Sequence, residues 1–343
     1  MRKMVEMDFE YLNYIPKAPV PTEKLYGQAC SNDQITMSSW RKVWIDNTKA
    51  NHERLGPFSK NHVGKYYNTN FMKPCIIAGS GPSLGNNIEE LKKKRDIKLI
   101  SCLHNFHYFE DNGIKPEMYV SLDAGEVTIE EITEGGKNPP SYYHEKTKDH
   151  TLACFIGSSP KLLETWKGEV VWFNAPIPDP GIMEELNKIE KFEMYISNGG
   201  NVLGACTYIA KAVMGSNPIA FVGSDFCFSY TKKFHPWESK YDEKLGHAIR
   251  AIDVFGNKVL TWGSYYNFKA WFDYICTVVP GSWVNCSEGG CMGAYPEGII
   301  MQIKQMALKE FIHQYYINEQ VEFMCKNPGD GKDPKTGQMK LLF

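Results

Sequence analysis

The sequence predicts an α/β fold, Rossmann-like, with a largely parallel sheet covered by helices on both faces. Two observations predict it. Short apolar runs of strand length alternate with stretches long enough to hold helices, and the first run ends in a glycine-rich turn before a helix-like segment. With 343 residues, 43% of them hydrophobic, the chain can bury a large core, which excludes disorder over most of its length.

The expected elements follow this alternation in chain order. A strand followed by a helix and another strand forms a right-handed crossover, so neighbouring strands are expected to be parallel. The expected strands are residues 73–79, 97–102, 118–122, 151–156, 170–173 and 219–222. The expected helices of this region are 86–95, 204–214 and 268–279, whereas residues 229–260 are expected to be irregular.

The N-terminal segment differs from this pattern. Residues 1–70 are mixed in composition, and one helix is expected near Ser38–Leu55, with Trp40, Trp44 and Ile45 on a shared face. We expect this segment to form an arm or a cap.

The remaining boundaries follow from composition. The nucleotide-binding catalytic domain is expected over residues 71–298, and one long C-terminal helix over 299–325, where apolar residues recur at helical spacing. Residues 326–343 are expected to form a flexible tail because the segment begins with several Gly, Pro and Asp residues.

Composition also excludes several classes of protein. Lys and Arg total 38 against 40 for Asp and Glu, so no overall field gathers nucleic acid or anionic lipid. No apolar run reaches the roughly 18 residues of a membrane span, and acidic residues follow Arg2 and Lys3, so we expect a cytoplasmic protein. The ten cysteines are scattered without metal-site spacing, which predicts reduced, mostly buried thiols.

The strongest motif is the turn after the first expected strand. Gly79 and Gly81 would let backbone N–H groups approach a phosphate, and Ser80 and Ser83 would add hydroxyl groups at a helix N-terminus. The full Gly-x-Gly-x-x-Gly pattern is absent because position 84 is Leu. The alternative is a tight turn with a serine cap.

A second glycine-rich turn precedes the expected helix at 204–214. It contains Asn198, Gly199, Gly200 and Asn201, and it would cradle another part of the same ligand or serve as a helix-entry turn. Because both turns lead into helices of one sheet, both are expected at the C-terminal edge of the strands, where ligands bind.

Three polar residues follow apolar runs directly. Asp123 and Asp225 each place a carboxylate at the end of an expected strand, where it can hold a metal, a ribose or a sugar hydroxyl, or cap the next helix. Asn105 follows the run at 97–102, and its amide can contact a base or a phosphate, or stabilise a turn.

The polar stretch after Asp225 reads as a mobile loop over the strand edge, and it contains candidate general bases. His235 and His247 lie in it, and a neutral imidazole can deprotonate a hydroxyl, although loop histidines are usually only solvated. Tyr230 and Tyr241 can donate to a departing phosphate, with ordinary packing as the alternative.

Taken in order, these motifs resemble the central domain of the bacterial motility-associated factor (Maf) glycosyltransferases, grouped with the archaeal 6-hydroxymethylpterin diphosphokinase (MptE-like) proteins. The opening motifs are also similar to those of bacterial sialyltransferases that use CMP-sialic acid. The resemblance covers about residues 60–300. The matching segments are residues 76–84, 112–116, 121–123, 198–204, 223–226 and 285–290.

The resemblance implies an inverting, metal-independent transfer from a nucleotide-activated sugar, with a CMP-linked, sialic-acid-like nonulosonate as the expected donor and a glycan or protein hydroxyl as acceptor. It implies no tightly bound cofactor. His235 matches a histidine of the Maf proteins and is the expected base, with Tyr230 and Asp225 beside it. The sialyltransferases carry their base later, near residues 261–266, where this chain has no His.

The alternative within the same group is a magnesium-dependent diphosphokinase that transfers pyrophosphate from ATP to a pterin. Related kinases place an Asp after the second strand, where this chain has His104 and Asn105, and this difference favours sugar transfer. Asn105 instead matches an Asn that the sialyltransferases use near the nucleotide. A third possibility is a nucleotide-binding protein without catalysis. The flanking segments are candidates for an acceptor platform or a homo-oligomer interface.

Overall fold

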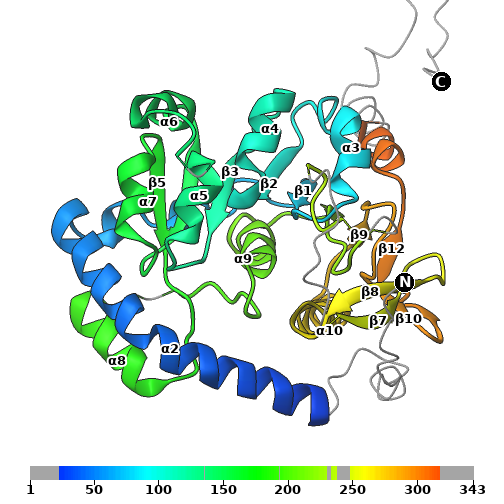
Figure 1. The fold of residues 1–343 in the computed structure, drawn as a ribbon. Helices are drawn as coiled ribbons and strands as arrows, with labels where there is room; N and C mark the ends of the chain where they lie inside the picture. Colours follow the sequence, from blue (N-terminus) through cyan, green and yellow to red (C-terminus); the bar gives the residue numbers. More distant parts are fainter. Residues whose placement is uncertain (1–22, 135, 193, 230–232, 238–247, 317–343) are drawn as a thin grey trace, which may run out of the picture.

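The computed structural model describes residues 23–134, 136–192, 194–229, 233–237 and 248–316. Its centre is an eight-stranded sheet in the order β12-β9-β6-β1-β2-β3-β4-β5, in which every pair is parallel (Figure 1). The strands are β1 Cys75–Ala78, β2 Lys98–Cys102, β3 Met118–Ser121, β4 Thr151–Phe155, β5 Glu169–Phe173, β6 Ile219–Val222, β9 Trp283–Asn285 and β12 Ile303–Gln305. The predicted parallel α/β architecture is confirmed.

The strands are apolar because both faces of the sheet are covered. Every residue of β1, β3 and β6 is buried. In β1, Cys75 lies opposite Lys98 of β2 and Ile219 of β6, so β1 is an interior strand of the sheet. Continuous apolar runs, rather than alternating ones, are what a parallel sheet covered on both faces requires.

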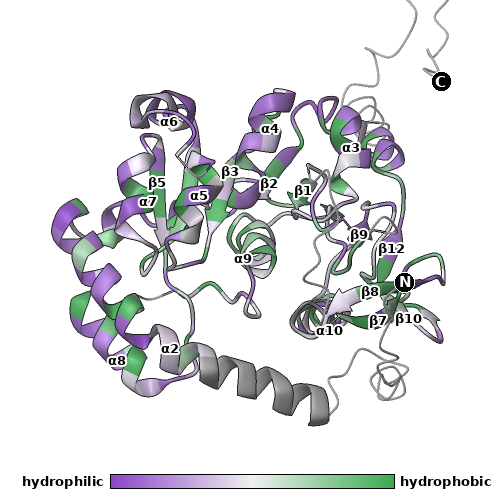
Figure 2. Cartoon of the chain, viewed as in Figure 1, coloured by the Kyte–Doolittle hydropathy of each residue, from purple (hydrophilic) through white to green (hydrophobic). Residues whose placement is uncertain are grey.

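The helices form two layers around the sheet. The crossovers from β1 to β5 place one set on one face. On the other face lie α9, in the return from β5 to β6, and α10, between β8 and β9 (Figure 1). α9 packs against β1, β2 and β3, and Figure 2 shows it as mostly hydrophobic, whereas α4 is largely hydrophilic. The first set is α3 Leu84–Leu91, η3 Leu103–Asn105, α4 Phe106–Asn112, α5 Val127–Thr133, α6 Pro140–Thr147 and α7 Pro160–Thr165. The second set is α9 Val202–Tyr208, η4 Ile209–Val213 and α10 Gly263–Val278.

The order of strands reverses beside β1. The chain builds β1 to β5 in one direction and then returns to place β6 on the other side of β1. In open α/β sheets, ligands bind at the C-terminal ends of the strands next to such a reversal. The ends of β1 and β6 are therefore the expected position of a site.

A long N-terminal helix, α2 (Glu23–Leu55), lies outside these layers. It packs against α8 (Pro180–Ile189) and continues toward α10 (Figure 1). The sequence predicted only its second half, near Ser38–Leu55. Within the described chain, no helix is long and apolar enough to cross a membrane.

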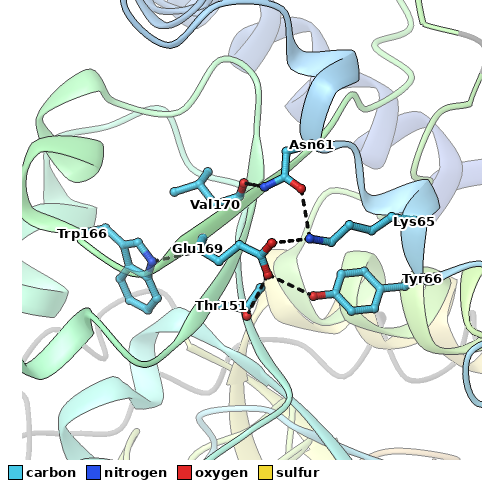
Figure 3. A network of polar contacts seen from close by, with 7 residues as sticks. All are labelled: Asn61, Lys65, Tyr66, Thr151, Trp166, Glu169 and Val170. Carbon is cyan, nitrogen blue, oxygen red and sulfur yellow. Dashed lines mark hydrogen bonds and ion pairs between the residues drawn. The ribbon is translucent and has the colours of Figure 1, made fainter.

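Two short 3-10 helices, η1 (Phe58–Asn61) and η2 (Val63–Tyr66), attach the end of this arm to the sheet (Figure 3). Lys65 pairs with Glu169 at the start of β5, and its Nζ also donates to Asn61 Oδ1 at 3.0 Å. Tyr66 and Thr151 donate to the other oxygen of Glu169, each at 3.4 Å. The hydrogen bond from Lys65 lowers the pKa of Glu169.

The prediction of a single helix over 299–325 is wrong. Residues 303–305 form β12, which pairs in parallel with β9, and the described helix runs only from 308 to 316. Ile300 and Ile303 suggested helical spacing, but Ile303 lies buried on the sheet opposite Trp283.

Five further strands were missed by the sequence prediction: β9 of the main sheet and four strands outside it. Two form a hairpin inside the region 229–260 that was expected to be irregular, and two form a small ladder near α10. They are β7 Ala248–Ile252, β8 Lys258–Trp262, β10 Ala294–Tyr295 and β11 Gly298–Ile299. The predicted helix at 268–279 is confirmed as the greater part of α10. The eight cysteines whose side chains the structure describes are free and buried, as predicted, whereas the tail at 326–343 lies outside the described residues.

Candidate functional site

The predicted glycine turn lies against the loop that follows β6. The Gly79 N–H donates to the Val222 carbonyl at 2.9 Å, and the Gly81 N–H donates to the Gly223 carbonyl at 2.8 Å. A Cβ atom on Gly79 would lie 2.5 Å from the Gly223 carbonyl oxygen, and one on Gly81 would lie 2.1 Å from Asp225 Oδ2. Both glycines are therefore required by the close approach of the two loops.

Asp225 joins the two loops through its side chain. Its Oδ2 accepts from the Ser83 backbone N–H at 3.1 Å and from Ser83 Oγ at 2.8 Å. The side chain is buried, and this burial raises its pKa to about 6 although the two hydrogen bonds oppose the shift. The N–H groups of Gly79, Gly81 and Ser83 thus bind protein oxygens, and Asp225 holds the turn.

Asn105 fixes the end of β1 from the neighbouring strand. Its Nδ2 donates to the carbonyls of Ala78 at 3.3 Å and Gly79 at 3.1 Å, and to Ser101 Oγ at 3.0 Å. The residue is completely buried, and its Oδ1 has no hydrogen-bond partner. An unsatisfied buried oxygen is costly, so this atom is suited to accept a hydrogen bond from a water molecule or a ligand.

The second predicted turn is built as a helix entry. Gly199 and Gly200 have left-handed φ values of +58° and +80°. Asn198 Oδ1 accepts from the Gly200 N–H at 2.7 Å, and Asn201 Oδ1 caps α9 at 2.9 Å. A Cβ on Gly199 would lie 2.3 Å from the Trp271 ring, so the turn packs against α10.

His235 lies directly over the first turn. Its Nδ1 is 2.7 Å from the Ser80 carbonyl oxygen. Because a carbonyl only accepts, Nδ1 carries the proton, and the lone pair of the neutral ring is on Nε2. The structure therefore brings together the predicted base and the turn.

Aromatic rings that sequence reasoning did not select hold this imidazole. Trp237 stacks on His235 with centroids 4.7 Å apart and an angle of 7°, and His104 lies 4.5 Å from it. The Tyr108 ring lies next to Trp237, with the centroids of these two rings 5.5 Å apart. The sequence signal for this cluster of rings was His104, which follows the second expected strand.

The end of β8 and α10 contribute a second row of aromatic residues. Trp262 and Tyr265 contact Phe234, which precedes His235, at 5.0 and 5.1 Å, and Phe268 lies beside Gly200. Burial raises the pKa of Tyr265 to about 12, so its hydroxyl stays protonated at neutral pH. α10 thus connects the His235 loop with the turn before α9.

Asp123 lies farther along the same edge, after β3. Its side chain is exposed, and Oδ1 accepts from the Gly125 N–H at 2.8 Å. In the order β6-β1-β2-β3, Asp123 and Asp225 follow strands three spacings apart, roughly 14 Å. They are too far apart to bind one metal ion.

The described residues contain no group of three or more His, Cys, Asp or Glu side chains placed to hold a metal. Tyr230, Tyr241 and His247 lie outside the described ranges, so their roles stay predictions.

Three comparisons relate this geometry to known proteins. The sequence model of the family described as 6-hydroxymethylpterin diphosphokinase MptE-like matches residues 42–231, more than half of the chain. An uncharacterized protein of Treponema pallidum (strain Nichols) is 31% identical over 83 residues, which are 24% of this chain and 38% of that protein.

The structure of the Maf glycosyltransferase from Magnetospirillum magneticum AMB-1 is similar with a TM-score of 0.51 and 16% identity. The match covers 81% of this chain, and this chain spans only 42% of that one. At this identity the similarity shows a shared fold.

Proposed function

The chain belongs to the 6-hydroxymethylpterin diphosphokinase MptE-like family, and on that premise we propose that it transfers a sugar from a nucleotide-activated donor to a hydroxyl group of a glycan or protein. The observation that carries the proposal is the hydrogen bond between His235 Nδ1 and the Ser80 carbonyl. It leaves the lone pair of the neutral ring on Nε2, the form that a general base requires. The shared fold with a glycosyltransferase supports the same reaction class.

In the proposed reaction, His235 Nε2 removes the proton from the acceptor hydroxyl as its oxygen bonds to the anomeric carbon. The bond from that carbon to the phosphate oxygen breaks, and its electron pair leaves with the nucleotide. Attack opposite the leaving group inverts the anomeric centre. Tyr230 is the proposed donor to the departing phosphate, and a CMP-linked nonulosonate is the proposed sugar donor.

Asp225 takes a positioning role in this proposal. Its Oδ2 is bound by both donors of Ser83, and Ser83 follows the turn whose Ser80 carbonyl orients His235. The carboxylate thus acts on the base through the turn.

The second candidate is pyrophosphoryl transfer from ATP, which the description of the family supports. That reaction needs carboxylates that hold magnesium between phosphates. The two candidate carboxylates do not fit a shared magnesium ion. Asp225 is buried and bound to Ser83, and Asp123 lies roughly 14 Å from it along the edge of the sheet. The geometry therefore favours sugar transfer.

The test combines binding and turnover. Calorimetric titration with CMP, CTP, UDP, GDP and ATP, each with magnesium and with EDTA, is expected to show metal-independent binding of CMP or CTP. His235→Ala is expected to keep this affinity and to lose transfer from a CMP-sugar, while His313→Ala, an exposed change on the last described helix, keeps both. Magnesium-dependent binding of ATP alone would reject the proposal in favour of the diphosphokinase.

A further inference from the structure

We infer that Trp40 of α2 and Asp123 after β3 form a subsite for a neutral, hydroxyl-bearing ring, which makes the N-terminal helix part of the ligand site. The inference deepens the proposed function and rests on it for the role of the bound ring in transfer. The placement of the two residues rests on geometry alone.

α2 is fixed to the edge of the sheet where ligands bind. Asn47 Nδ2 donates to the Ala124 carbonyl at 3.2 Å, and Asn51, one turn later, donates to the carbonyls of Ile156 at 3.0 Å and Ser158 at 2.9 Å. These carbonyls belong to the loops that follow β3 and β4. One face of α2 therefore lies across the C-terminal ends of two strands.

Trp40 lies on this face, two turns before Asn47, and reaches the Asp123 loop. A Cβ on Gly125 would lie 3.2 Å from Trp40 Cη2 and 3.2 Å from Asp123 Oδ1, so the indole and the carboxylate both border the space beside this glycine. The Gly125 N–H donates to Asp123 Oδ1 and fixes the carboxylate. Asp123 is exposed and Trp40 is half-buried, so both can contact a ligand.

The two side chains together select the chemistry of the ligand. An indole offers a flat apolar surface to the C–H face of a sugar ring, and a carboxylate accepts hydrogen bonds from hydroxyl groups. A carboxylate repels a phosphate, and the adjacent Glu126, which pairs with Lys161, is a second acid at this position. The ring proposed for this subsite therefore carries no negative charge.

The spacing along the sheet separates this subsite from the proposed base. Asp123 follows β3, whereas the turn under His235 follows β1, two strand spacings or roughly 10 Å away. A ligand with its phosphate near the turn can place a second ring at Trp40. The ring is the ribose of the nucleotide or a sugar that is not attached to it.

The experiment uses the full chain with three probes: CMP, 2′-deoxy-CMP and methyl β-galactoside. Affinities are measured by calorimetry and saturation-transfer NMR for the wild type, Trp40→Ala, Trp40→Phe and Asp123→Asn. Trp44→Phe is the matched control, since Trp44 lies one turn along the same helix and packs against Phe155. Far-ultraviolet circular dichroism checks that α2 is retained.

If the subsite binds the ribose, Trp40→Ala and Asp123→Asn weaken CMP by about tenfold and abolish the preference for CMP over 2′-deoxy-CMP. If it binds a separate sugar, CMP affinity is unchanged and galactoside binding falls by about tenfold. In both cases Trp40→Phe retains part of the affinity and Trp44→Phe retains all of it.

The inference is overturned if CMP and the galactoside bind Trp40→Ala and Asp123→Asn as they bind the wild type, or if the wild type binds neither of these two probes. Failure of the proposed function gives a different result. In that case the wild type binds the galactoside in a Trp40-dependent way but binds no nucleotide and transfers no sugar.

Discussion

Ser83 Oγ donates to Asp225 Oδ2 at 2.8 Å, and this bond joins the turn after β1 to the loop after β6. The two residues are 142 positions apart in the sequence. This pair stabilises the turn that contacts the proposed base, because His235 is hydrogen-bonded to the Ser80 carbonyl.

Asp225 is expected to make stability depend on pH between about 4 and 6. Burial raises its pKa from 3.8 to about 6 in the folded protein, so the folded state binds more protons than the unfolded state in this window. Its contribution to the free energy of unfolding therefore falls as pH rises from 4 to 6, by up to roughly 3 kcal/mol, and is constant above. Urea unfolding across this range measures it, and Asp225→Asn is expected to remove the part of the slope that Asp225 contributes. An unchanged slope contradicts the assignment.

Gly81→Ala is expected to destabilise the protein by about 2–4 kcal/mol, because its Cβ would lie 2.1 Å from Asp225 Oδ2. The matched control is Gly263→Ala at the start of α10, where an added Cβ meets nothing within 4 Å. Thermal unfolding of both variants makes the comparison. Equal melting temperatures would show that the two loops tolerate separation.

Trp237→Ala is expected to lower kcat for transfer about tenfold or more while CMP affinity stays unchanged, because the ring stacks on His235 and restricts its orientation. Trp237→Phe preserves a flat ring and is expected to recover part of the rate. Steady-state kinetics with a CMP-sugar measure both. A rise in the KM for the donor at constant kcat would instead assign Trp237 to donor binding.

Asn51→Ala is expected to cost about 1–3 kcal/mol, because it leaves the buried carbonyls of Ile156 and Ser158 without their donor. Lys49→Ala, an exposed change on the same helix, is expected to cost less than about 0.5 kcal/mol. Chemical denaturation gives both values, and hydrogen exchange is expected to show α2 released in the first variant only. Equal protection of α2 in both variants would contradict the inference that Asn51 fixes α2 to the sheet edge.

Two lysine–carboxylate pairs are expected to differ in how much the loss of the lysine lowers the free energy of unfolding. Lys269 Nζ lies 2.7 Å from Asp273 Oδ2, and both side chains are buried on α10. Burial raises the pKa of Asp273, while Lys269 opposes the shift. Lys269→Met leaves that carboxyl buried without its cation and is expected to cost about 3–5 kcal/mol. Lys65→Met breaks the exposed pair with Glu169 and is expected to cost about 1 kcal/mol or less. Unfolding free energies that are equal for the two variants would refute this difference.

The strands β1 to β6 were predictable because a strand covered on both faces is an uninterrupted apolar run, and each run here is bounded by turn residues. β9 and β12 have three residues each, too few to show a period, and β12 lies where Ile300 and Ile303 have helical spacing. The β7–β8 hairpin alternates buried and partly buried residues inside a polar region, so its apolar signal is weak.

The candidate site was predictable in part. The turn at Gly79, Asp225 and His235 each follow a strand, so the topology brought them together. The sequence did not reveal that the N–H groups of the turn bind the loop after β6, because this contact joins positions far apart in the chain. Trp40 beside Asp123 was equally hidden, since it depends on how α2 docks.

The return of the chain from β5 to β6 has a consequence for biosynthesis. In a nascent chain that has not yet released residues 219–222, β1 would be the edge strand of any sheet that the first five strands form, because its partner β6 is missing. No N-terminal fragment that ends before β6 contains Asp225, so truncated chains lack this carboxylate and expose a strand edge that promotes aggregation. Limited proteolysis of nascent chains stalled before and after β6 would show when the edge closes.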